Sequence, residues 1–231
     1  MARKTGLRQR KKEQTRRRIE AVARELFTQH GFDGVTVDEI AAGADIAPRT
    51  FFHYFATKED VALADFAARL ADLVTELDNR PPDEPPWVAL CGAFLAVASD
   101  YERQRDRLTS QFMIMAGSPS VQARSLQLQA DCENALAVSL AQRRGEGPGE
   151  TITTSLLAAS AVGAMRSSLR HWLLAGHDVP LPSLLETCFR YLTHGLDDNA
   201  GSESQPMKPA DEARRLRLDL LRKQPPGRST G

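Results

Sequence analysis

The sequence contains few of the residue groups from which catalytic and metal sites are built. Its three cysteines, Cys91, Cys132 and Cys188, are too far apart for a Cys-x2-Cys pair or a disulfide framework. The five histidines form no His-x3-His pair, and no Gly-x-Ser-x-Gly or P-loop motif occurs. We therefore expect no metal, no cofactor and no enzyme activity, in the reducing setting of the cytoplasm.

Long apolar runs are also missing. The longest stretch without a charge, 108–123, has 16 residues, and the stretches 85–99 and 151–165 have 15 each. A helix needs about 20 to cross a bilayer, so we expect no membrane partner. Hydrophobic residues make up 42% and charged residues 26% of the 231, an ordinary composition for one or two globular domains.

The formal net charge of zero hides an uneven distribution. Residues 1–18 hold nine Lys or Arg against one Glu, a balance of +8, and the remaining 213 residues therefore carry −8. Such asymmetry points to a nucleic acid or another anionic partner for the head. Either Arg3–Lys12 reaches phosphates or an adjacent minor groove, or the head is a solvated tail.

Helical spacing of apolar residues dominates the chain, and no sustained strand alternation is found. We predict an all-α fold of about nine helices, with a break at Asn79–Pro86, where four of eight residues are proline. The expected helices cover 11–30, 37–44, 48–55, 57–79, 87–101, 108–116, 119–144, 150–175 and 181–195. The last 35 or so residues are either disordered or carry a short helix at 210–222.

Residues 36–58 carry the pattern that indicates function. Thr36 and Glu39 form a capping box, Asp45 and Ile46 a tight turn, and Pro48 suits the first position of a helix. Two short helices joined by a tight turn behind an amphipathic helix predict a helix-turn-helix unit. The helix predicted at 48–55 would turn Phe51 and Phe55 inward. It would present four residues to the DNA major groove, namely Arg49, Thr50, His53 and Tyr54.

The residues Thr36-Val-x-x-Ile40-Ala41, Ile46-Ala-Pro-Arg-Thr-Phe-Phe-His-Tyr-Phe55 and Lys58-Glu59 resemble the N-terminal domain of TetR-family transcriptional regulators. By position, this resemblance implies a DNA-facing set made of Thr36, Pro48, Arg49, Thr50, Phe52, His53, Tyr54 and Lys58. Three residues depart from the family pattern. Ala47 removes a helix cap, Arg49 adds a cation, and Phe52 replaces a tyrosine.

The resemblance also implies an effector pocket and a dimer interface in the later helices. By position, the candidate pocket residues are Phe94, Tyr101, Phe112, Met115, Leu128, Cys132, Leu169 and Trp172. The alternative for this set, and for the Phe112, Met113 and Met115 stripe in particular, is a plain hydrophobic core.

Small residues recur every four positions at Ser155, Ala159 and Gly163, which favours close helix packing. This stripe either forms the dimer interface or packs within one subunit. Arg166 and Arg170, next to His171, form either a solvated face or an anion-binding group near the pocket mouth. The second reading follows a similarity of the C-terminal half to regulators that bind acyl-CoA-like ligands.

These inferences divide the chain into a basic arm (1–14), a helix-turn-helix DNA-binding domain (15–62), a ligand-binding and dimerisation domain (63–198) and a disordered tail (199–231). We expect a homodimeric repressor that binds a palindromic double-stranded DNA operator and is released by a small apolar, acyl-CoA-like effector. The fourth helix would couple the two domains. The alternatives are an all-α carrier or enzyme with an incidental helix-turn-helix, and a redox sensor that uses Cys91 or Cys132. The apolar faces around both thiols disfavour the redox sensor.

Overall fold

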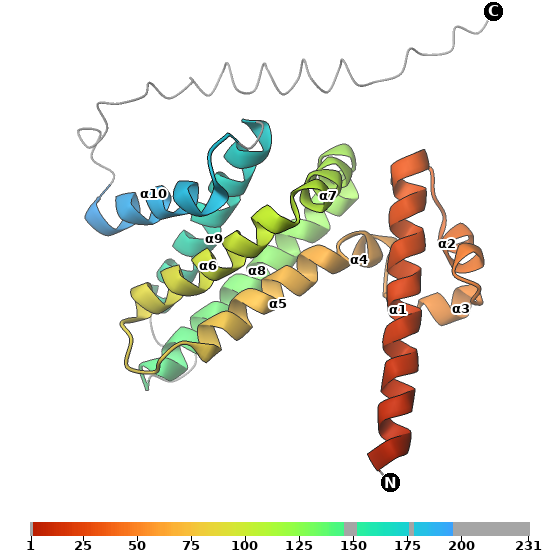
Figure 1. Cartoon of the computed structure of the whole chain (residues 1–231), viewed down its shortest axis with the longest axis horizontal. Helices are drawn as coiled ribbons and strands as arrows, with labels where there is room; N and C mark the ends of the chain where they lie inside the picture. The colour runs from red at the N-terminus through yellow and green to blue at the C-terminus, as the bar shows by residue number, and fades with distance from the viewer. Residues whose placement is uncertain (1, 146–151, 176–177, 196–231) are drawn as a thin grey trace, which may run out of the picture.

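The computed structural model describes residues 2–145, 152–175 and 178–195. Within these residues all the regular elements are helices, ten in number (Figure 1). The predicted all-α fold is therefore confirmed. The expected tail at 199–231, with the alternative helix at 210–222, lies outside the described residues.

The first four helices surround one apolar core. They are α1 (Ala2–His30), α2 (Val37–Gly43), α3 (Pro48–Phe51) and α4 (Lys58–Ala62). Helix α1 contributes the stripe Ile19, Ala23 and Phe27, as its periodicity predicts. It ends at Gly31, whose φ of 73° and N–H bond to the Phe27 carbonyl (3.0 Å) form an αL cap. We call α1–α4 the N-terminal unit.

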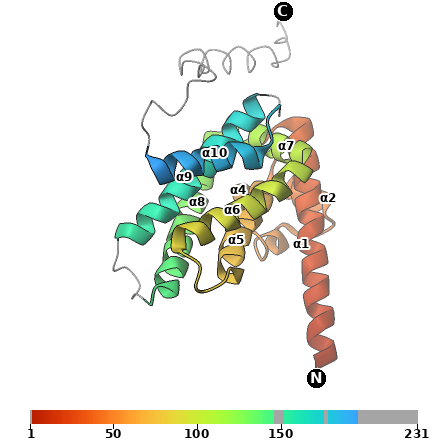
Figure 2. The same ribbon diagram turned by 60° about the vertical axis from the view of Figure 1, so that its left-hand side comes forward.

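The remaining helices enclose a second, larger core. They are α5 (Ala64–Asn79), α6 (Pro86–Arg103), α7 (Arg105–Gly117), α8 (Pro119–Arg143), α9 (Ile152–Leu174) and α10 (Leu181–His194). Helix α5 packs on α6 and α8, α8 also packs on α9, and α10 lies against α6 and α9 (Figure 2). We call α5–α10 the C-terminal bundle.

The structure has one helix more than the nine predicted, because the predicted fourth helix is divided at Leu63 into α4 and α5. The Leu63 side chain is fully buried in the N-terminal core. Its N–H still bonds the Glu59 carbonyl at 2.9 Å, and its carbonyl accepts from Ala67 at 2.8 Å, so the bend leaves neither group unpaired. The surrounding sequence has no glycine or proline to signal the break, which tertiary packing of Leu63 accounts for.

Candidate nucleic-acid interface

The predicted capping box is present at the start of α2. The Glu39 N–H donates to Thr36 Oγ1 (3.2 Å), and both the Thr36 N–H and its hydroxyl donate to Glu39 Oε2 (2.7 and 2.8 Å). These bonds hold the pKa of Glu39 below its ordinary value of 4.5. Thr36, which the family resemblance places against DNA, is exposed, and its hydroxyl proton is engaged by Glu39.

The turn between α2 and α3 is a Schellman motif. The Ile46 N–H bonds the Ala41 carbonyl (3.0 Å), and the Asp45 N–H bonds the Ala42 carbonyl (3.1 Å). Asp45 adopts a φ of 50°, a left-handed conformation that Asp tolerates better than most residues. The motif satisfies the last carbonyls of α2 and fixes the direction in which α3 leaves.

The recognition helix is shorter than predicted, because α3 ends at Phe51 and not near Phe55. The residues after α3 are held by hydrogen bonds between residues three apart, as in a 3₁₀ turn. The His53 N–H donates to the Thr50 carbonyl (3.1 Å) and the Tyr54 N–H to the Phe51 carbonyl (2.9 Å). As the departure at Ala47 predicts, no side chain caps the start of α3.

The segment from Pro48 to Phe55 presents one side to solvent and one to the core. Phe51 and Phe55 are buried, with ring centroids 5.7 Å apart. Thr50 and Tyr54 are half-buried. The exposed residues that this segment contributes to the predicted set form what we call the recognition surface, made of Pro48, Arg49, Phe52 and His53.

Phe52 is the unusual member of this surface. Its side chain is 56% exposed, although a large aromatic ring gains free energy by leaving water. It stands edge-on against Phe51 at a centroid distance of 5.4 Å, which holds the ring in place. Beside it, Arg49 can donate two hydrogen bonds to a guanine, and the Phe52 ring can contact a thymine methyl.

Lys58 has an internal role that its position in the motif does not reveal. Its Nζ donates to the carbonyls of Phe32 (2.9 Å) and Val35 (2.8 Å) and lies 4.2 Å from the Phe32 ring centroid. Two of its three N–H donors therefore hold the loop between α1 and α2.

The predicted pocket residues do not form one group. The C-terminal core includes Phe94, Tyr101, Cys132 and Trp172, all buried, and Leu169 packs against it. Phe112 is half-buried, and the side chain of Met115 lies outside the described set. Leu128 instead packs against the N-terminal core, so the structure separates it from the others.

A buried cation, which no sequence pattern singled out, lies beside this group. Arg69 on α5 is 6% exposed, and its guanidinium lies 5.4 Å from the Tyr101 ring centroid. It donates to Gln111 Oε1 on α7. Burial raises the pKa of Tyr101. The C-terminal bundle thus contains a charged and hydrogen-bonding group within an apolar core.

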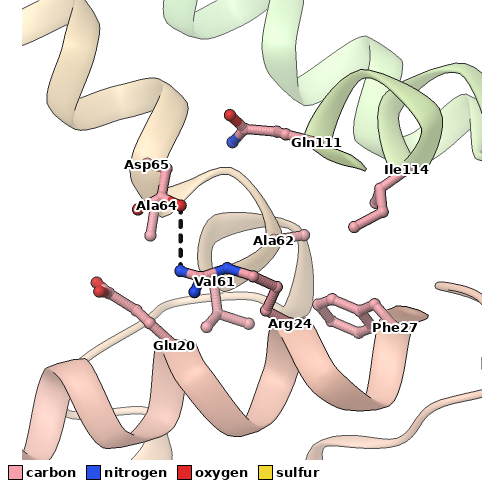
Figure 3. Close-up of a pocket in the computed structure, with 9 residues that line it drawn as sticks. All are labelled: Glu20, Arg24, Phe27, Val61, Ala62, Ala64, Asp65, Gln111 and Ile114. Carbon is pink, nitrogen blue, oxygen red and sulfur yellow. Dashed lines mark hydrogen bonds and ion pairs between the residues drawn. The ribbon is translucent and has the colours of Figure 1, made fainter. Parts of the chain in front are cut away.

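Two ion pairs join the N-terminal unit to the C-terminal bundle. In the first, Arg24 on α1 pairs with Asp65 on α5 (3.1 Å) above a small cavity of about 30 Å³, which Gln111 and Ile114 also line (Figure 3). In the second, Arg124 on α8 pairs with Asp60 on α4 (2.8 Å).

Helix α8 also enters the N-terminal core directly. Val121 is fully buried there and Leu128 packs against the same cluster. The fourth helix, which we expected to couple the two parts, is therefore accompanied by a second connection through the first turns of α8.

The predicted dimer stripe lies on the outer side of α9. Ser155 and Ala159 are exposed, and a Cβ built on Gly163 would meet nothing within 4 Å. In the part of the chain that the structure describes, no other helix covers Ser155 and Ala159. Arg166 and Arg170 share the exposed side, away from the buried Trp172.

Among the described residues, no group of three or more His, Cys, Asp or Glu side chains could hold a metal ion. Nor does any helix among them have the length and apolar character required to cross a membrane.

Comparison with known proteins identifies the family. Residues 19–64 match the model for bacterial regulatory proteins of the tetR family, and residues 84–197 match that for the MftR C-terminal domain. The chain is 34% identical over 188 residues to a protein of Mycobacterium tuberculosis named as a mycofactocin biosynthesis transcriptional regulator, MftR, covering 81% of this chain and 94% of that protein. The chain belongs to the TetR family. It is a helix-turn-helix transcriptional regulator, as its recognition segment predicts.

Other TetR-family proteins agree with this assignment. TcmR, a helix-turn-helix transcriptional regulator of Streptomyces glaucescens, is 33% identical over 175 residues, which cover 73% of this chain and 77% of TcmR. Among solved structures, the repressor FadR of Thermus thermophilus, in complex with lauroyl-CoA, shares the fold with a TM-score of 0.55 at 24% identity, over 82% of this chain and 99% of FadR. A TetR-family regulator from Streptomyces coelicolor aligns with a TM-score of 0.50 at 21% identity, over 91% of this chain and 99% of that one.

Proposed function

We propose that this regulator is a homodimeric repressor that binds a palindromic operator and is released by a small apolar effector. The observation that carries the proposal is the recognition surface. Arg49, Phe52 and His53 project from a segment whose neighbours α2 and α4 each begin with a complete capping box, so its orientation is fixed before DNA binds. DNA contact would bury the exposed Phe52 ring.

The outer side of α9 supports the homodimer. Besides Ser155, Ala159 and Gly163, it exposes Ile152 (86%) and Leu156 (64%). Exposed apolar side chains beside small residues are typical of a surface covered by a partner helix. A two-fold dimer through α9 and α10 would place the two recognition segments about 34 Å apart, or a multiple of that distance, to read a palindrome.

The effector would enter the C-terminal bundle. Its core is apolar around Phe94 and Trp172, and Arg69 supplies one buried cation for an acidic group. This chemistry suits an acyl chain with a polar head, such as an acyl-CoA thioester, the class that FadR holds as lauroyl-CoA. Binding would require the tightly packed core to open, because ligand pockets have volumes of about 300–1,000 Å³.

Release from DNA would then follow from population shift. DNA favours the dimer conformation in which the distance between the two recognition surfaces fits its two half-sites. The effector favours a conformation with another distance. The two affinities must be linked reciprocally, so operator DNA weakens effector binding by the same factor by which effector weakens operator binding.

The experiment is a gel shift on a duplex that the full chain selects from random-sequence DNA, with the variants Arg49→Ala and Arg103→Ala. Each removes one exposed arginine, but only Arg49 lies on the recognition surface, whereas Arg103 lies at the end of α6. We expect Arg49→Ala to weaken binding about 10- to 100-fold, the discrimination of one bidentate base contact, and Arg103→Ala to leave it unchanged. A carrier or enzyme with an incidental helix-turn-helix predicts no selected sequence at all.

Titration with lauroyl-CoA, with coenzyme A as the control without an acyl chain, tests the effector. Lauroyl-CoA should dissociate the operator complex and coenzyme A should not. Equal effects of the two compounds would refute the apolar effector while leaving operator binding intact.

A further inference from the structure

Helix α1 is much longer than its core requires. Among its described side chains, Ile19 is the first that is buried, yet the helix begins at Ala2. Its N-terminal half extends past α2 and α3 into solvent (Figure 1). The basic head, expected as an arm over 1–14, is thus a helical continuation of α1 from Ala2 onward. At 1.5 Å per residue, Lys12 lies about 10 Å and Arg8 about 16 Å beyond Ile19 along the axis.

Two sets of cations on this extension occupy opposite faces. Arg8, Lys12 and Arg16 recur every four residues and continue the side of α1 that carries Ile19 and Ala23. Arg16 shows where this side points, because its guanidinium lies 4.8 Å from the ring centroid of Phe55. Phe55 ends the recognition segment, Pro48 to Phe55, so Arg16 lies beside this segment, and the same side of α1 continues past it to Lys12 and Arg8.

Arg10 and Arg17 lie on the other face, roughly 150° around the axis at 100° per residue. Arg17 is further neutralised by an ion pair with Glu13 (3.0 Å). Arg8, Lys12 and Arg10 are all exposed. The extension therefore carries two pairs of exposed cations that differ in the side of the helix they occupy.

We propose that Arg8 and Lys12 bind backbone phosphates of the operator outside the base pairs that the recognition surface reads. The inference rests on the proposed operator binding and deepens it. An α-helix is about 10 Å wide with its side chains, whereas the minor groove is about 6 Å wide, so the helical extension crosses the backbone and does not enter that groove. The contact would be independent of sequence and would lengthen the footprint of each half-site.

The experiment compares Arg8→Ala/Lys12→Ala with Arg10→Ala/Arg17→Ala in the full chain. Both remove two cations per subunit, and alanine preserves the helix, which circular dichroism verifies. Operator affinity is measured between 50 and 200 mM salt on a duplex that the wild type selects from random DNA. Hydroxyl-radical footprints on the same duplex locate the contacts.

Loss of four phosphate contacts per dimer should make the slope of log K against log salt less steep by about 3.6 for Arg8→Ala/Lys12→Ala. Over this salt range the wild-type affinity would then fall about 150-fold more than that of the variant. The footprint of this variant should lose its outer edges, whereas Arg10→Ala/Arg17→Ala should keep both slope and footprint.

Equal slopes for the two double variants, whether reduced together or both unchanged, would overturn the inference while operator binding stands. If the wild type selected no sequence from the random pool, the proposed function would fail first, and this inference with it.

Discussion

The first turn of α8 contributes to the stability of a unit to which it does not belong in sequence. Val121 is fully buried in the core built by α1–α4, while most of α8 packs on α5 and α9. Val121→Ala removes two methyl groups there. At about 0.8 kcal/mol per buried carbon, plus a term for the cavity, the cost is about 2–3 kcal/mol.

A valine in the other core provides the matched control. Val162 on α9 is 4% exposed and belongs to the C-terminal core, so Val162→Ala removes the same two methyl groups at a similar total cost. Hydrogen exchange read by mass spectrometry on peptides from α1 and α4 separates the two variants. Val121→Ala should raise the opening equilibrium of those peptides about 30- to 150-fold, the equivalent of 2–3 kcal/mol, and Val162→Ala should not.

The reasoning would be refuted if both valine variants increased exchange in α1 and α4 to the same extent. That result would mean that the two cores unfold as one unit, so that the position of Val121 has no local consequence. Exchange in the α9 peptides supplies the reverse control, because Val162→Ala should affect them more strongly.

Three other predictions concern single side chains. Lys58→Met should lower stability without DNA by about 2 kcal/mol, or 4–8 °C in thermal unfolding, because two charge-assisted bonds to loop carbonyls are lost; an unchanged melting temperature would assign Lys58 to DNA alone. Burial raises the pKa of Cys91 to about 11 and that of Cys132 to about 12. Both thiols should therefore resist a disulfide reagent at pH 8 until the protein unfolds. Rapid labelling of the folded protein would instead support the redox-sensor alternative. Glu39 has a lowered pKa, so the stability that its carboxylate contributes is present above pH 4.5 and is lost as the pH falls through its folded pKa. The melting temperatures of wild type and Glu39→Gln should therefore converge as the pH is lowered. Melting temperatures that fall in parallel would contradict the role of the cap.

The helix-turn-helix segment could be predicted because its signals are local. The Thr36 and Glu39 cap, the turn at Asp45 and the uncapped start at Ala47 each depend on residues within a few positions of one another. Hydrogen bonds of this range leave a direct record in the sequence. The exposed faces of Arg49 and His53 then follow from helical periodicity.

The features that could not be predicted depend on contacts between distant residues. Leu63 divides a helix because its side chain enters the N-terminal core, and Leu128 joins that same core from far along the chain. Lys58 holds carbonyls 23 and 26 residues earlier. Arg69 and Gln111 are 42 residues apart. Apolar spacing identifies the buried side of a helix, but it does not say which helix covers that side.

These distant contacts imply how an effector could move the recognition surface. The bend at Leu63 links the N-terminal unit covalently to α5, and Val121 links the unit to α8. Two separate helices of the C-terminal bundle are therefore attached to the N-terminal unit. Both helices line the same core, since α5 and α8 pack on each other. A ligand that separates them must shift at least one of the two attachments. An N-terminal unit held by α5 alone could pivot, so that the distance between the two recognition surfaces of a dimer would stay the same. A unit held at two points must move with the C-terminal bundle. If the proposed effector expands this core, the second attachment would convert that expansion into displacement of the recognition surface.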